Sequence, residues 1–141
     1  VGKFNQSIKK PIRTKIEQDS IGVQGADLLV FPASWPQFGK VLSDYIVPTR
    51  AIENHVFCVA VNRAGTERGT QLLGRSKIAH WFGRALAEGK RNEEDILYAD
   101  IEPAEARQKR FVIVSGEHEA DFINDRRPEF YDLVCQVSPI S

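Results

Sequence analysis

The two cysteines of the 141-residue chain, Cys58 and Cys135, carry its strongest potential nucleophiles. A thiol attacks as the thiolate, and an apolar environment raises the thiol pKa and keeps the group unreactive. Cys58 lies between Phe57 and Val59 in an apolar run, so we expect it to fill the core. Cys135 lies in the segment Leu-Val-Cys-Gln-Val, outside any motif, where we also expect a structural role, with an intermolecular contact as the alternative. We therefore expect neither cysteine to be a catalytic residue.

Metal centres and phosphate loops are the next kinds of site to consider. His55, His80 and His118 do not have the spacing of metal ligands, and no cysteine joins them. His55 ends an expected helix, where a protonated imidazole interacts favourably with the helix dipole. Gly65 and Gly69 flank Thr-Glu-Arg, which lacks the lysine and the spacing of a phosphate-binding loop. We predict no metal site and no cofactor.

The loop that contains Ser34 and Trp35 is the best candidate for ligand binding. It follows the apolar run from Ala26 to Phe31, which glycine and proline bound, and which predicts a buried strand of a parallel sheet. Open α/β sheets bind ligands at the carboxyl ends of their strands, where this loop would lie. We therefore predict Ser34 and Trp35 as substrate-binding residues. The alternative is that Trp35 only packs over the helix around Phe38.

Hydrophobic patterning predicts the elements that would position this loop. Apolar residues at helical spacing predict a helix from Lys40 to His55, which Pro48 must kink or divide. The continuous apolar composition of Val56 to Val61 predicts a strand buried on both faces. The other expected elements are a helix over Ile12–Gln24, a polar connection over Asn62–Thr70, a strand over Leu72–Trp81, a return strand over Ala85–Glu88, a strand over Ile96–Ile101, a short helix over Pro103–Lys109 and irregular chain after Val114. This order predicts an α/β layered sandwich with a mixed sheet.

Composition excludes several classes of protein. The chain has 19 Lys and Arg against 19 Asp and Glu, and this balance argues against a dedicated nucleic-acid binder and a polybasic membrane anchor. No apolar run approaches about 20 residues, so no membrane-spanning helix is expected. Two cysteines cannot make a disulfide framework and fit a reducing cytoplasmic compartment. Because the chain begins at Val1 and contains no Met, we expect it to be processed or to be part of a longer protein.

Five segments together resemble one family, with their order and gaps in register. They are Gly25–Pro36 (GADLLVFPASWP), Arg50–Phe57 (RAIENHVF), Asn62–Glu67 (NRAGTE), Gly74–Ile78 (GRSKI) and Arg126–Tyr131 (RRPEFY). Each motif is weak alone, but five in register are a strong signal. The sequence from about Gly25 to Leu133 resembles the nitrilase family of carbon–nitrogen hydrolases.

The resemblance implies part of a four-layer αββα sandwich, within one domain over 1–141 that is complete or partial. It also implies a site with a Cys nucleophile, a Glu general base and a Lys that stabilises the tetrahedral intermediate. The family's Glu and Lys lie in an N-terminal half that this chain does not contain, and its Cys would fall near Lys9, where there is none. We therefore assign no catalytic residue, and we treat 1–24 as a divergent N-terminal segment and 121–141 as an extended C-terminal tail. By the same resemblance, Ser34 and Trp35 border the substrate pocket, and Asn62 and Glu67 form its rim.

The expected function is hydrolysis of nonpeptide carbon–nitrogen bonds in a small amide, carbamoyl compound or nitrile. We expect this chain to be inactive alone and to bind such a substrate only when an N-terminal half completes it. The alternative is a non-catalytic homologue that acts through association. The resemblance also implies a homo-oligomer that pairs through the helix from Val41 to Ile52 and the tail from Asp121 to Tyr131, with Arg126 or Arg127 meeting carboxylates of the other chain.

Overall fold

The computed structural model describes Gly22 and residues 24–130. The chain divides between Gln108 and Lys109 into two compact units, each of which is described on its own. The helix expected over Ile12–Gln24 and the divergent segment 1–24 lie outside the described residues, apart from Gly22 and Gln24. No helix in the described part of the chain is long and apolar enough to cross a membrane.

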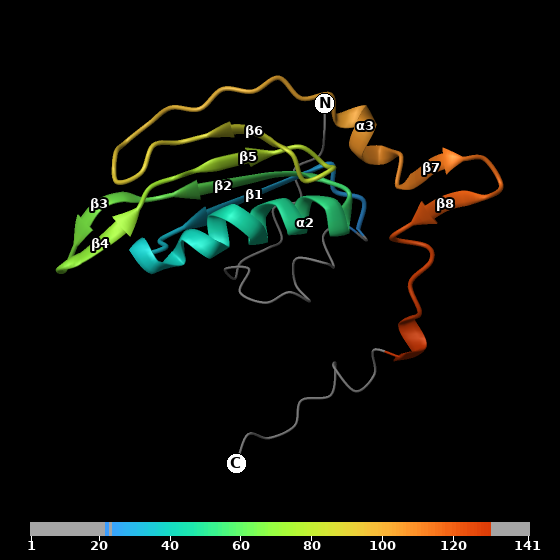
Figure 1. Ribbon diagram of the computed structural model, residues 1–141, viewed down its shortest axis with the longest axis horizontal. Coiled ribbons are helices and arrows are strands. Elements are labelled where there is room, and N and C mark those ends of the chain that lie inside the picture. The colour runs from blue at the N-terminus through green and yellow to red at the C-terminus, as the bar shows by residue number, and fades with distance from the viewer. Residues whose placement is uncertain (1–21, 23, 131–141) are drawn as a thin grey trace, which may run out of the picture. The chain divides into compact units, whose positions relative to one another are not determined.

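A mixed sheet forms the centre of the first unit (Figure 1). Its strands are β1 (Leu28–Ala33), β2 (Phe57–Asn62), β5 (Lys77–Ala79) and β6 (Ala85–Glu88), in the order β1-β2-β5-β6. β1 and β2 are parallel because a helical crossover joins them, whereas the other neighbours are antiparallel. The α/β class and the mixed sheet are thus confirmed.

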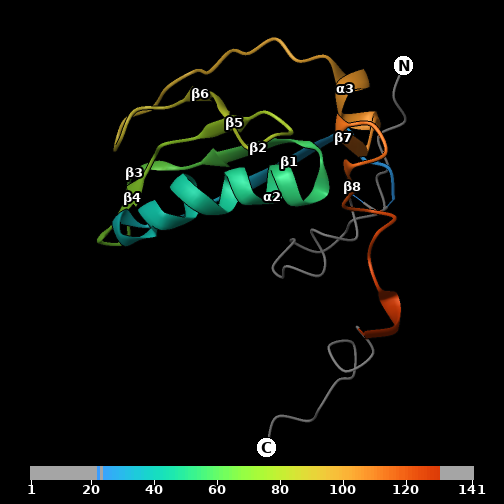
Figure 2. The same ribbon diagram turned by 45° about the vertical axis from the view of Figure 1, so that its right-hand side comes forward.

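The crossover from β1 to β2 covers one face of the sheet, and it changes helix type on the way (Figures 1 and 2). It contains the 3₁₀ turn η1 (Gln37–Gly39), the π-helix η2 (Leu42–Ile46) and the α-helix α2 (Val47–Asn54). Pro48 has no N–H to donate to the carbonyl four residues back, and the preceding N–H, of Val47, bonds to Leu42 O in the π pattern. The helix therefore changes type near Pro48 but is not divided, because Ile46 and Val47 at the junction both keep right-handed helical dihedral angles. α2 ends where His55 adopts a left-handed φ of 50°.

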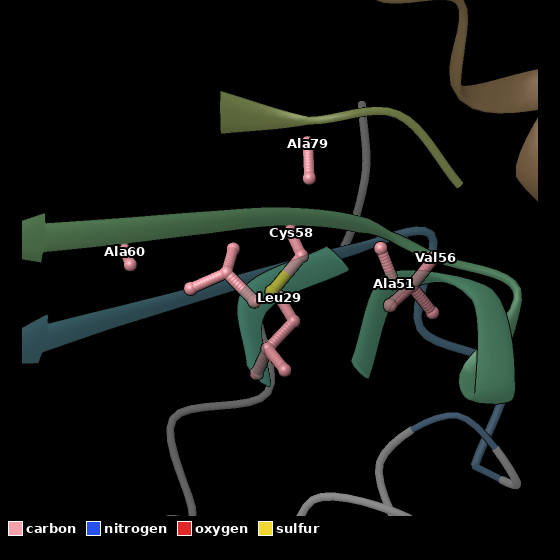
Figure 3. Close-up of a cluster of buried hydrophobic side chains, with 7 residues drawn as sticks. Leu29, Ala51, Val56, Cys58, Ala60 and Ala79 are labelled. Atoms are coloured by element: carbon pink, nitrogen blue, oxygen red, sulfur yellow. The ribbon is translucent and has the colours of Figure 1, made fainter. Parts of the chain in front are cut away.

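The hydrophobic core lies between this helical layer and the sheet. Its buried members are Leu29, Val47, Ala51, Val56, Cys58, Ala60 and Ala79, with Phe31 and Trp35 packed against them. Figure 3 shows how Leu29 and Cys58 extend from neighbouring strands toward the helix. The small side chains of Ala51, Ala60 and Ala79 allow the helix to approach the strands closely.

The other face of the sheet is apolar and partly exposed. Register places Leu28, Val30 and Pro32 of β1 beside Phe57, Val59 and Val61 of β2. Leu28 is 36%, Val30 48% and Val61 50% exposed. Adjacent exposed aliphatic side chains of this kind mark surface that packs against another layer. We call the five side chains Leu28, Val30, Pro32, Val59 and Val61 the open face.

The polar connection predicted over Asn62–Thr70 is wrong, because it contains half of a hairpin. β3 (Ala64–Glu67) pairs with β4 (Thr70–Leu73) in antiparallel register. Arg68 and Gly69 both have positive φ, 48° and 80°, which is the geometry of a tight two-residue hairpin turn. β3 lacks the apolar alternation of a half-buried strand because its residues are largely exposed, whereas β4 buries Leu72 and Leu73.

Two predicted strands also need correction. The strand over Leu72–Trp81 is broken into β4 and β5, because Gly74 and Arg75 adopt positive φ values of 64° and 50°. The strand over Ile96–Ile101 is irregular chain, in which Ile96 is 74% and Tyr98 82% exposed. Its apolar residues meet no partner strand among the described residues, and an unpaired segment cannot satisfy its backbone as a strand.

The first unit ends with α3 (Pro103–Arg107), two residues shorter than predicted. Glu102 caps it by accepting a hydrogen bond from Ala104 N–H at 3.2 Å, and Pro103 occupies the first turn as expected.

The second unit is built on the hairpin of β7 (Arg110–Val114) and β8 (His118–Asp121). The irregular chain predicted after Val114 is therefore wrong for β8. Beyond it, the Asp121 carboxylate accepts hydrogen bonds from the N–H groups of Ile123 and Asn124, which forms a turn. η3 (Pro128–Phe130) follows, so the described part of the expected tail contains a turn and a 3₁₀ helix.

Candidate functional site

The carboxyl ends of β1 and β2 lie side by side, and they position the predicted ligand-binding loop. Ala33 and Asn62, the last residues of the two strands, are partners in register. The Ser34–Trp35 loop follows Ala33 directly and is bridged to β4 through the pair Pro36 and Leu72. The loop therefore stands at the sheet edge where open α/β sheets bind ligands.

Asn62 is buried at this edge, and its side chain bridges two segments. Its Oδ1 accepts a hydrogen bond from Trp35 N–H at 2.8 Å, and its Nδ2 donates to Gly74 O at 2.7 Å. Its backbone N–H donates to Ser76 Oγ at 3.0 Å, and Ser76 Oγ donates back to Asn62 O at 3.3 Å. The structure thus brings three of the predicted site residues, Ser34, Trp35 and Asn62, to one place.

The backbone of the loop is held from several sides, whereas its serine side chain is exposed. Arg63 N–H donates to Ala33 O at 3.0 Å, and Leu73 N–H donates to Trp35 O at 2.9 Å. The Trp35 ring packs at 6.0 Å from Phe31, not over Phe38, whose side chain is 87% exposed. Ser34 is exposed, and no described residue hydrogen-bonds its hydroxyl.

Glu67, the fourth predicted residue, lies away from the other three. It ends β3 at the hairpin turn, is exposed, and forms an ion pair with Arg63. Carboxylates in such exposed pairs are hydrated and contribute little to stability.

Gln37 and Arg91 support the loop, although neither is among the residues predicted for the site. The Gln37 amide donates to Leu72 O at 3.1 Å and to Asn92 Oδ1, and its Oε1 accepts from Arg91 Nε and Nη2 at 3.0 and 2.7 Å. Gln37 follows the Ser34–Pro36 segment directly, and this adjacency was the available signal. Nothing in the sequence pattern pointed to Arg91, 54 positions away.

Cys58 is placed for packing and not for catalysis. Burial raises the pKa of its thiol to about 12, and the positive charge of Arg50 offsets only part of that rise. Figure 3 shows its sulfur among core side chains. At neutral pH such a thiol is protonated, so it is a poor nucleophile. Cys135 lies outside the described residues, as does the position near Lys9.

A second polar cluster lies around His80, near the opposite end of the strands, and both of its ring nitrogens are engaged. Nδ1 accepts from Phe82 N–H at 3.1 Å, so the proton of the neutral ring is on Nε2, which contacts Glu105 Oε2 at 3.1 Å. Trp81 Nε1 donates to the same carboxylate oxygen at 3.0 Å, and these two contacts lower the pKa of Glu105. The cluster fastens α3 to the sheet and leaves no ring nitrogen free to act as a base.

Similarity to known proteins agrees with this geometry. The family model described as carbon-nitrogen hydrolase matches residues 18–111. A protein named nitrilase from Pyrococcus abyssi is 31% identical over 112 residues, which are 79% of this chain and 40% of that protein. A 2-oxoglutaramate amidase from Bacillus subtilis is 37% identical over 87 residues, which are 62% of this chain and 33% of that protein.

A solved structure shares the fold. An amidase from Nesterenkonia sp. AN1 superposes with a TM-score of 0.66 at 23% identity, over 82% of this chain and 38% of that one. The chain thus spans about two fifths or less of the length of these relatives. The family model covers well over half of this sequence, and the chain belongs to the carbon–nitrogen hydrolase family.

Proposed function

We propose that this chain forms the C-terminal part of a hydrolase that cleaves nonpeptide carbon–nitrogen bonds in a small amide, carbamoyl compound or nitrile. The proposal includes a reducing, cytoplasmic setting, which suits the free thiol of Cys58. Relatives named nitrilase and 2-oxoglutaramate amidase support the substrate class. In this proposal the chain supplies a wall of the substrate pocket, and another part of the enzyme supplies the nucleophile.

The observation that carries the proposal is the Ser34–Trp35 loop, fixed at the carboxyl edge of β1 and β2 beside the open face. The open face would pack against the second sheet of an αββα sandwich, because its aliphatic side chains would there be removed from water. A substrate at the edge of that sandwich would then meet the exposed Ser34 hydroxyl and the Trp35 ring.

The chemistry divides accordingly. In the family reaction a thiolate attacks the amide or nitrile carbon, and a carboxylate activates first the thiol and then water. Among the described residues Cys58 is protonated and buried, so the attacking thiolate has to come from elsewhere. What this chain offers is binding: a hydroxyl that can hydrogen-bond the substrate and an aromatic ring that excludes water.

The test is a chimera with the part of the Pyrococcus abyssi nitrilase that lies outside the matched 40%. We expect no ammonia release from simple amides or nitriles by this chain alone, and release by the folded chimera. Trp35→Ala should lower kcat/KM of the chimera by about 10- to 100-fold, because the ring positions the substrate. Phe38→Ala, which removes an aromatic ring that is 87% exposed nearby, is the matched control and should leave the rate unchanged.

Two results would contradict this. A chimera that folds but never releases ammonia would count against the hydrolase pocket. Ammonia release by the chain alone that Cys58→Ala or Cys135→Ala abolishes would show that it carries its own nucleophile.

A second candidate function is association, and the outer surface of the crossover favours it. Phe38, Val41 and Tyr45 are 87%, 59% and 66% exposed and follow one another at spacings of three and four residues. Such spacing places side chains along one side of a helical segment. We propose that this stripe pairs with its copy in a homodimer, since isologous pairing is the commonest way to close an oligomer.

Light scattering tests the homodimer directly. We expect a dimer mass for the full chain and a monomer mass for Val41→Lys/Tyr45→Lys, because two buried cations per subunit would oppose association. Tyr98→Lys changes an aromatic residue that is 82% exposed outside the stripe and should remain dimeric. We also propose that the tail contributes to the dimer through Arg126 or Arg127. Within its own chain Arg127 pairs with Glu129. If either arginine also contacts a carboxylate of the partner, deletion of the chain after Ala120 should weaken the dimer. A monomer mass for the unmodified chain would refute the dimer.

A further inference from the structure

We infer that Asn62 is a positioning residue, whose side chain sets where the Ser34–Trp35 loop stands by tying it to Gly74. The inference extends the predicted location of Asn62 at the pocket rim to a specific role. Its significance for substrate binding rests on the proposed function, but the positioning itself does not.

The side chain at this place has to accept and donate at once. Oδ1 accepts from Trp35 N–H at 2.8 Å while Nδ2 donates to Gly74 O at 2.7 Å. A carboxylate could only accept and an aliphatic side chain could do neither, so among side chains of this length only the amide satisfies both backbone groups at neutral pH. The two contacts also fix which way the amide is turned.

Asn62 cannot move to serve a different partner. It is only 7% exposed, and its own backbone is held by the two hydrogen bonds with Ser76. Rotation of the amide would leave Trp35 N–H and Gly74 O unpaired in a buried place, which costs more than the bond itself contributes. A substrate in the pocket would therefore contact the Ser34–Trp35 loop that Asn62 positions, and not Asn62 itself.

The loop depends on Asn62 for one of three backbone anchors. The other two are Arg63 N–H on Ala33 O and Leu73 N–H on Trp35 O. Asn62 is the only one of these anchors that acts through a side chain, so a substitution can remove it alone. Its loss should release Trp35 N–H and shift Ser34, the residue between the anchored carbonyl and the anchored amide.

The far end of the link is itself rigid. Gly74 N–H donates to Arg63 O at 3.0 Å, and Gly74 forms a bridge with Arg91. Asn92 N–H donates to Leu73 O at 2.9 Å beside it. Asn62 thus connects the ligand-binding loop to the backbone around Gly74, which its own hydrogen bonds hold in place.

The test is amide hydrogen exchange at Trp35, measured by NMR on the full chain. Asn62→Ala should lower the protection of Trp35 N–H about tenfold relative to the unmodified protein, as expected when one hydrogen bond of ordinary strength is lost. Asn54→Ala is the matched control: Asn54 is also buried and its amide donates to Arg50 O at 3.1 Å, but it lies at the end of α2. It should lower global stability but leave the protection of Trp35 N–H, relative to the other amides of the loop, as it is in the unmodified protein.

Asn62→Asp provides a second variant whose outcome depends on pH. At neutral pH the introduced carboxylate would face Gly74 O, repel it and turn toward solvent, which releases the loop. When protonated, the carboxyl group can donate to Gly74 O and accept from Trp35 N–H, as asparagine does. Burial raises the pKa of the introduced group, so about tenfold of protection should return as the pH falls from about 7 to about 4.

Equal Trp35 protection in Asn62→Ala and Asn54→Ala would overturn the inference. If Asn62→Ala does not fold, Asn62→Asp decides the matter, and unchanged protection between the two pH values would then overturn it. Neither measurement involves hydrolysis. An inactive chimera with normal behaviour of Trp35 N–H would therefore refute the proposed function and leave the positioning role standing.

Discussion

Replacement of Gly74 by alanine should destabilise the folded chain by about 3 kcal/mol or more, among the largest effects of any single methyl group here. Gly74 has a φ of 64°, a left-handed conformation that costs a residue with a Cβ about 1–2 kcal/mol. The added Cβ would also lie 2.8 Å from Lys90 O and 3.1 Å from Asn92 N. Both are backbone atoms, so no side chain can rotate to make room.

Gly69 provides the matched control for this substitution. It too has positive φ, 80°, but nothing lies within 4 Å of a Cβ placed there. Gly69→Ala should therefore lose only the conformational contribution, about 1–2 kcal/mol. Urea denaturation of both variants measures the difference, which isolates the close approach to Lys90 and Asn92. Similar shifts in the two midpoints would show that the backbone of Lys90 and Asn92 does not approach Gly74 as closely as the structure indicates.

The elements that the sequence predicted best are those whose partners lie close in sequence. β1 and β2 stand out as continuous apolar runs because both of their faces carry apolar side chains, although the helix covers only one face and much of the open face is exposed. A disturbance of the crossover helix near Pro48 could be expected from a single covalent fact, its missing N–H, and the structure shows it as a change of helix type. The loop after β1 could be placed at a ligand-binding edge because parallel strands share one carboxyl edge.

The errors came from elements that depend on distant pairing. β3 is polar and largely exposed, so nothing in its composition separates it from a loop, and only the Arg68-Gly69 turn signals its pairing with β4. Ile96–Ile101 has the apolar content of a strand but meets no described partner. The role of Asn62 likewise depends on Gly74, twelve positions away, whose carbonyl direction follows from a φ that sequence does not reveal.

The distribution of polar groups over the two faces of the sheet supports the proposed architecture. Ser43 of η2 is fully buried on the helix-covered face, where its hydroxyl donates to Arg75 O at 3.1 Å. Lys77 is 4% exposed on the same face. The open face, in contrast, carries only aliphatic side chains. A two-layer protein would carry polar side chains on the sheet face that its helix does not cover. This arrangement is instead that of an inner layer, with the open face turned toward the dry centre of a larger sandwich.

An ion cluster on the helix-covered face gives the second large effect that we expect. Lys77 Nζ lies 2.9 Å from Glu88 and 3.8 Å from Asp44, and Arg75 contacts both carboxylates. Lys77→Met keeps most of the aliphatic stem but removes the ammonium, and it should destabilise the chain by about 2–3 kcal/mol. Removing one partner of a fully buried pair costs about 3–5 kcal/mol. The effect here is smaller because the Glu88 side chain is 35% exposed and Arg75 remains.

Lys40→Met is the matched control, since Lys40 pairs with the same Asp44 at 3.1 Å but is 56% exposed. Such a surface pair contributes less than about 1 kcal/mol, so this variant should unfold close to the unmodified chain. Comparable losses in the two variants would mean that the burial of Lys77 contributes nothing.

The pH dependence of the Lys77→Met effect follows from the two carboxylates. Burial alone raises the pKa of Glu88, but the hydrogen bonds and charges of Lys77 and Arg75 outweigh it and hold the pKa below its usual value. Burial likewise raises the pKa of Asp44, and Lys40, Arg75 and Lys77 together lower it further than that. A carboxyl group whose pKa is lower in the folded state stabilises the fold above its unfolded-state pKa and loses that contribution as the pH falls through the folded-state pKa. The difference in unfolding free energy between Lys77→Met and the unmodified chain should therefore be full at pH 7 and shrink on acidification below the ordinary carboxyl pKa values. Urea titrations across that range measure it, and a difference that stays constant would show that the cluster is not held together by charge.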